Sequence, residues 1–183
     1  MRKEIVGRFY VDTSVWGFLF EEALVEKRRF TESFFNKVKE GRVEIFVSAL
    51  VIEELDRTKD PILREKLLNS LRDYSPVVLS YDEEVERIAG RIVELGAIPE
   101  NLLDDARHIG YTVFNLLDGI VSWNMKHIVK MTTRKVVSAI CRIEGYREPF
   151  SLLRGRVYMQ GIEVLEKTLH QSRTVLRGLR GIV

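Results

Sequence analysis

Short apolar runs alternate with longer stretches of helical periodicity along most of this chain. Runs rich in β-branched and aromatic residues predict strands at 8–12, 43–48, 76–81 and 118–123, with a fifth at 150–153. Periodic stretches between them predict helices at 31–40, 48–55, 61–72, 82–96, 102–115 and 132–145. This alternation predicts a three-layer α/β/α sandwich with a parallel, Rossmann-like sheet of four to five strands.

Several predicted helices carry end signals. Thr31 is a candidate N-cap, with Gly41 just past the far end of the same helix. Asp82 can cap the helix that Gly96 terminates, and acids fill its first turn. These signals define the helix boundaries independently of the apolar pattern.

The last 30 residues differ from the body, which we expect to be one domain over residues 1–153. Residues 154–183 carry six basic and two acidic side chains, hence +4, whereas the whole chain carries +2 and the body therefore −2. Apolar residues recur there at spacings of three and four, which predicts a basic helical extension. The apolar residues of this extension form a seam that either docks on the body of the protein or binds a partner. Its basic residues either contact phosphates or form a solvated helix face.

Composition narrows the class of protein. The lone Cys141 cannot form an internal disulfide, so a disulfide-stapled secreted scaffold is excluded and a cytoplasmic location is expected. The basic start of the chain lacks the apolar stretch of a signal peptide. No window approaches the ~20 apolar residues of a membrane span.

Polar residues gather where the predicted strands end. In parallel α/β sheets, ligands bind at the carboxyl ends of strands. Clustered carboxylates repel each other unless a cation compensates, and oxygen ligands suit Mg²⁺ and Mn²⁺. Such ions promote phosphodiester hydrolysis by activating water and polarising a phosphoryl oxygen. The candidate residues are Asp12, Glu54, Asp104, Asp105, Asp118 and Asn124.

Each acid also has a purely structural interpretation. Asp12 could cap a helix or form a turn, and Asp118 could serve a turn. Glu54 could be a surface acid, while Asp104 and Asp105 could complement a helix dipole. Their joint placement at successive strand ends favours a site.

Four segments that contain these acids follow one another along the chain, and they read VDTSVW, SALVIEEL, LDDARHIGY and DGIVSWNMKHI. In this order they closely resemble the motifs of the PIN-domain nucleases, above all the branch that includes VapC-type toxins. The resemblance covers roughly residues 8–150. The last motif is the most specific, because an acid, a strand, Ser-Trp-Asn and Lys-His follow in order.

The resemblance implies a role for each matching residue. Asp12, Glu54 and Asp105 match the family's acidic ligands for Mg²⁺ or Mn²⁺. Asn124 stands where many members have a fourth aspartate, which lowers the charge of the site by one. Asp118 precedes that strand and is expected to replace part of the missing charge as a further ligand.

Neighbouring residues have alternative interpretations. Thr13 and Ser14 resemble positions that orient ligands or waters, and His108 is expected to be structural. Trp16 and Trp123 are expected to be core or pocket walls, with base stacking as the alternative.

The implied function is a metal-dependent ribonuclease, a PIN-type hydrolase that cleaves RNA as the toxin of a toxin–antitoxin pair. An antitoxin partner and a homodimer are implied with it. The alternative is a catalytically weak scaffold that binds RNA or protein. A nucleotide-binding Rossmann enzyme is disfavoured, because the first turn reads DTSVWG and not G-x-G-x-x-G.

Overall fold

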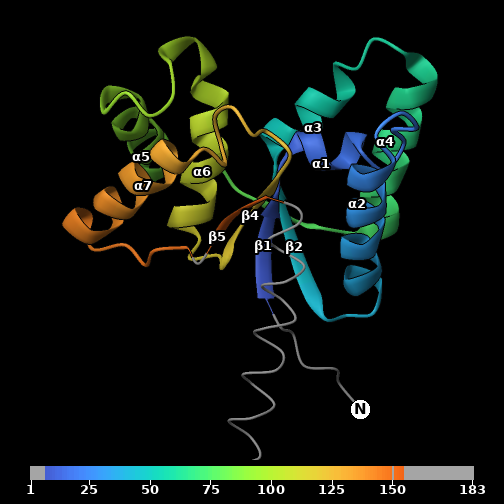
Figure 1. Ribbon diagram of the computed structural model, residues 1–183, viewed down its shortest axis with the longest axis horizontal. Helices are drawn as coiled ribbons and strands as arrows, with labels where there is room; N and C mark the ends of the chain where they lie inside the picture. Colours follow the sequence, from blue (N-terminus) through green and yellow to red (C-terminus); the bar gives the residue numbers. More distant parts are fainter. Residues whose placement is uncertain (1–6, 150, 155–183) are drawn as a thin grey trace, which may run out of the picture.

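The computed structural model describes residues 7–149 and 151–154, so the expected seam beyond Ile162 lies outside the described residues. A parallel five-stranded sheet in the order β3-β2-β1-β4-β5 forms the centre (Figure 1). Its strands are β1 (Gly7–Val11), β2 (Val43–Ser48), β3 (Val77–Leu79), β4 (Gly119–Ser122) and β5 (Ser151–Arg154).

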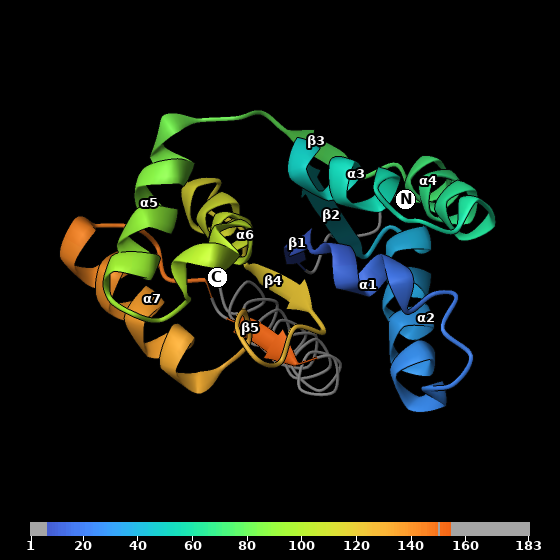
Figure 2. The ribbon, with the colours of Figure 1, turned by 90° about the horizontal axis from the view of Figure 1, so that it is seen from above.

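Helices cover both faces of the sheet, with α1 to α4 on one side and α5 to α7 on the other (Figure 2). The predicted three-layer α/β/α class with a parallel sheet is therefore confirmed, and it is consistent with a PIN-like fold. The helices are α1 (Thr13–Gly17), α2 (Val25–Lys39), α3 (Ala49–Asp56), α4 (Pro61–Tyr74), α5 (Glu83–Glu94), α6 (Leu103–Phe114) and α7 (Met131–Glu144), and a 3₁₀ turn, η1 (Glu100–Leu102), precedes α6.

The middle strand, β1, is apolar on both sides because helices bury both of its faces. Phe9, Tyr10 and Val11 are all at most 3 % exposed. The register pairs Val11 with Val121, so Asp12, the residue after β1, lies beside Ser122, the last residue of β4. This register therefore places the carboxyl end of β1 beside the carboxyl end of β4.

The predicted start of α2 at Thr31 is wrong. The helix begins at Val25, and the residue before it, Leu24, forms no side-chain capping bond. Thr31 lies in the helix interior, where its hydroxyl donates to the Lys27 carbonyl at 2.9 Å and accepts from the Trp123 indole nitrogen at 3.0 Å. A tertiary contact therefore uses the hydroxyl that the sequence pattern assigned to capping.

Other end signals are confirmed. Asp82 caps α5 by accepting from the Glu84 amide at 2.8 Å. Gly96 follows that helix at a φ of 69°, a left-handed conformation that glycine adopts without steric cost. The strand predicted over 76–81 is shorter than expected, because only three residues of β3 pair with β2.

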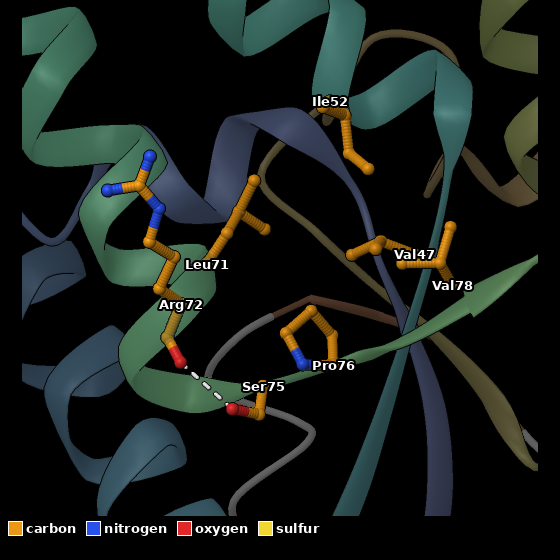
Figure 3. Close-up of a pocket in the computed structure, with 7 residues that line it drawn as sticks. All are labelled: Val47, Ile52, Leu71, Arg72, Ser75, Pro76 and Val78. Carbon is orange, nitrogen blue, oxygen red and sulfur yellow. Dashed lines mark hydrogen bonds between the residues drawn. The ribbon is translucent and has the colours of Figure 1, made fainter.

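A shallow apolar hollow lies at the β3 edge of the sheet, beneath α3 and α4 (Figure 3). Its lining includes one cationic residue and no carboxylate, so it is distinct from the predicted acidic site. The lining residues are Val47, Ile52, Leu71, Arg72, Ser75, Pro76 and Val78. Within the described residues, no helix is long and apolar enough to cross a membrane.

Close packing of α5 on α6 depends on Gly110. A Cβ at this position would lie 2.7 Å from the Val85 carbonyl oxygen, whereas one at the exposed Gly90 of α5 would meet nothing within 4 Å. Both glycines are in helix interiors, so they differ mainly in the space around them.

We predict opposite effects of the same substitution at these two glycines. Gly110→Ala should lower the free energy of unfolding by about 1–3 kcal/mol, because backbone must move to admit the methyl group. Gly90→Ala should raise it by roughly 0.5–1 kcal/mol through helix propensity. Urea unfolding of the two variants measures both, and equal shifts would contradict the close approach of α5 and α6.

Candidate metal centre

Asp12 follows β1 directly and caps α1. Its Oδ1 accepts from the Ser14 amide at 3.0 Å and from the Ser14 hydroxyl, and its Oδ2 accepts from the Ser122 hydroxyl at 2.8 Å. The residue is 3 % exposed. Asp12 is thus a helix cap and also a buried carboxylate at the carboxyl edge of the sheet.

Glu54 reaches the same edge from α3. The Thr13 hydroxyl donates to its Oε2, and His108 Nε2 lies 3.2 Å from the same oxygen. The neighbouring Glu53 lies on the outer face of the helix, where it pairs with Arg57 at 3.2 Å. Glu54 therefore faces the site and Glu53 faces away from it.

Asp105 and Asn124 lie together. The Asn124 amide nitrogen donates to Asp105 Oδ2 at 2.9 Å, and Asn124 Oδ1 accepts from the His127 amide at 3.1 Å. Asp104 instead forms an ion pair with Arg107 at 2.7 Å and is largely exposed. Of the two adjacent aspartates, only Asp105 joins the group.

Asp118 does not join the group, contrary to expectation. It precedes β4 and therefore lies at the amino ends of the strands, opposite to the site. There its Oδ2 accepts from the Arg8 amide at 2.8 Å and its Oδ1 pairs with Arg147 at 2.8 Å. Arg8 precedes Asp12 by four residues of strand, or about 13 Å at ~3.3 Å per residue. In a parallel sheet, a residue that precedes one strand and a residue that follows another lie at opposite ends of the strands, so they cannot belong to the same site.

The three remaining acids influence one another's ionisation. Burial raises the pKa of Asp12, and the nearby Asp105 adds to this, although His108 and the hydroxyls of Ser14 and Ser122 oppose it. Burial likewise raises the pKa of Asp105, against the hydrogen bond from Asn124. Both carboxylates therefore remain harder to ionise than usual, and a bound cation would stabilise their charged forms.

His108 balances part of this negative charge. Burial raises the pKa of Glu54, but the hydrogen bonds from His108 and Thr13 and the charges of His108 and Arg57 together lower it below its usual value. Burial lowers the pKa of His108, but its bond to Glu54 and the charges of the acids raise it above its usual value. The imidazole is 2 % exposed.

A buried chain of hydrogen bonds holds the imidazole in place. Its Nδ1 lies 2.9 Å from the Tyr10 hydroxyl, which lies 2.7 Å from the Ser48 hydroxyl. Sequence reasoning treated His108 as structural and did not identify Tyr10 or Ser122. The available signal was spacing, since His108 is one turn beyond Asp105 and Tyr10 precedes Asp12 by two strand residues.

The donor set fits a hard divalent cation by its chemistry. Within the described residues, no group of three or more His, Cys, Asp or Glu side chains is already arranged around a common point. The hydrogen bonds to Glu54 converge on Oε2, and the bond to Asp105 uses Oδ2. Asp12, Glu54 and Asp105 would hold such an ion through their carboxylate oxygens.

Comparison with known proteins adds no assignment. A scan against family models finds no matching family, and a search of curated proteins finds no match. The interpretation of this site therefore depends on its geometry and on the motif resemblance.

We predict that His108 stabilises the fold through its polar contacts. His108→Leu should lower the free energy of unfolding by about 1–3 kcal/mol, because Glu54 and the Tyr10 hydroxyl lose a buried partner. His108→Gln, which retains a donor and an acceptor, should cost less. Equal losses in urea unfolding would show that ring packing, and not hydrogen bonding, determines the effect.

Proposed function

We propose that this protein is a metal-dependent endoribonuclease of the PIN type. The observation that carries the proposal is the convergence of Asp12, Glu54 and Asp105, from three distant segments, at the carboxyl edge of a parallel sheet. Repulsion among one buried and two partly buried carboxylates makes such a group costly unless a cation accompanies it. The ordered PIN-like motifs support RNA as the substrate.

Each proposed ligand is oriented by a neighbour. Ser14 and Ser122 hold Asp12, while Thr13 and His108 hold Glu54. When bound, Mg²⁺ or Mn²⁺ would polarise a phosphoryl oxygen of the RNA and activate a water.

Asn124 acts on Asp105 through its amide and adds no charge of its own. We therefore assign it a positioning role. Hydrogen bonds of this kind determine how well ligands are aligned.

A second candidate is a scaffold that binds RNA or protein without cleaving it. The observation that favours it is that hydrogen bonds within the group already engage all three acids, and no described set of three metal-binding side chains is arranged around one point. The toxin role, an antitoxin partner and a homodimer are further proposals, and they depend on the motif resemblance alone.

The metal site predicts a simple binding contrast. Asp12→Asn should weaken Mn²⁺ binding at least about tenfold, because it removes a charge while asparagine still caps α1. Asp118→Asn should leave the affinity unchanged, since Asp118 lies at the opposite edge. Isothermal titration with Mn²⁺ measures both, and loss of affinity in the Asp118 variant alone would place the ion elsewhere.

Cleavage provides the second test. In Mn²⁺, Asp12→Ala, Glu54→Ala and Asp105→Ala should each lower the rate of RNA cleavage at least about 100-fold, more than is typical for groups that only orient ligands. Glu53→Ala is the matched control and should cleave like the parent. A metal-bound parent that cleaves no RNA would leave the scaffold candidate.

A further inference from the structure

Two aromatic rings and one ammonium group meet beside the acidic group. Phe18 follows α1, Lys27 lies in the first turn of α2, and Trp123 follows β4. The ring centroids are 5.5 Å apart with planes inclined by 56°. Lys27 Nζ lies 4.7 Å from the Phe18 ring centre and 5.3 Å from that of Trp123. We call these three residues the aromatic rim.

The aromatic rim is connected directly to the acids. The Trp123 amide donates to the Ser14 hydroxyl at 2.9 Å, and Ser14 in turn donates to Asp12. Phe18 lies six residues beyond Asp12 along α1, or about 9 Å at ~1.5 Å per residue. A nucleic-acid strand bound at the acids would therefore place a neighbouring base near the rim.

The indole of Trp123 is held at one edge while its ring remains partly exposed. Its Nε1 donates to Thr31 Oγ1 at 3.0 Å, and Thr31 is itself 2 % exposed. Trp16, by contrast, is fully buried against Phe35, with ring centroids 4.9 Å apart. The two tryptophans thus differ in burial, since Trp16 is enclosed in the core whereas Trp123 is partly exposed at its margin.

We infer that the aromatic rim is a base-binding subsite for the RNA substrate. An unpaired base stacks on Trp123 beside Phe18, and the Lys27 ammonium moves from the rings to the adjacent phosphate. An unpaired base suits this surface because bases in a duplex are already stacked on one another. The inference rests on the proposed function and adds to it a contact for one base beside the acids.

The alternative explanation is that the aromatic rim only stabilises the fold, since a cation near two aromatic rings is itself a stabilising contact. In that case, Trp123 variants would lose stability without distinguishing one RNA from another. An oligomer that lacks bases separates the accounts, because it retains the phosphates and removes the stacking partner.

The test measures the affinity of the full chain for fluorescein-labelled octauridylate and for an abasic oligomer of equal length, in EDTA to prevent cleavage. Trp123→Leu should weaken binding of octauridylate about 5–100-fold while affecting the abasic oligomer little. Trp123→Phe should retain most of the affinity. Equal losses for both oligomers, or no loss for either, would overturn the inference.

The contribution of Lys27 is tested by the salt dependence of RNA binding. Lys27→Met should weaken both oligomers and reduce the salt dependence of binding by about one phosphate contact. Arg142→Met is the matched control, because Arg142 lies on α7 with its side chain 77 % exposed. An unchanged salt dependence in the Lys27 variant would remove Lys27 from the subsite.

Fluorine NMR keeps the inference testable if Trp123→Leu unfolds. With 5-fluorotryptophan in the intact chain, octauridylate should shift the Trp123 resonance and leave that of Trp16 in place. Failure of the proposed function is distinguishable, because it would appear as no Mn²⁺-dependent cleavage by the parent. Cleavage by the parent with an unmoved Trp123 resonance would reject the aromatic rim alone.

Discussion

Repulsion among the buried carboxylate of Asp12 and the partly buried carboxylates of Glu54 and Asp105 is the constraint around which the carboxyl edge of the sheet is organised. Two of these acids have a raised pKa because burial and neighbouring charge disfavour ionisation. His108 compensates in part, and its contact with Glu54 joins α6 on one face of the sheet to α3 on the other. The imidazole therefore links the two helical layers at the point where negative charge is concentrated.

The register between β1 and β4 determines which residues surround Asp12 in the turn that follows β1. Because Val11 pairs with Val121, Ser122 lies beside Asp12 and donates to it at 2.8 Å. Ser14 connects the same carboxylate to the Trp123 amide. One short turn of helix thus aligns a proposed metal ligand and also the partly exposed ring proposed to bind a base. A substitution in this turn should therefore affect metal binding and base binding together.

Some features were predictable from local pattern because local forces determine them. The glycine after α5 and the Asp82 cap are examples, since both satisfy backbone groups within a few residues. The inward orientation of Glu54, with Glu53 outward, follows from helix periodicity. The start of α2 was not predictable in this way, because Thr31 hydrogen-bonds a tryptophan 92 residues away. Asp118 was misplaced because the motif resemblance was given more weight than its position before β4, at the opposite end of the strand from the site.

The fold class followed from the sequence, since alternating strand and helix periods leave few ways to bury both faces of a sheet. The sequence also placed Asp12 directly after a strand, Glu54 on the helix that follows another strand, and Asp105 at the start of a further helix. Tertiary packing brings these three acids to the same end of the sheet and determines what surrounds them. The pairing of His108 with Glu54, the anchoring of Trp123 on Thr31 and the isolation of Asp118 all join residues distant in sequence. Periodicity specifies the face on which a side chain lies, whereas sheet register and helix packing specify what it contacts there.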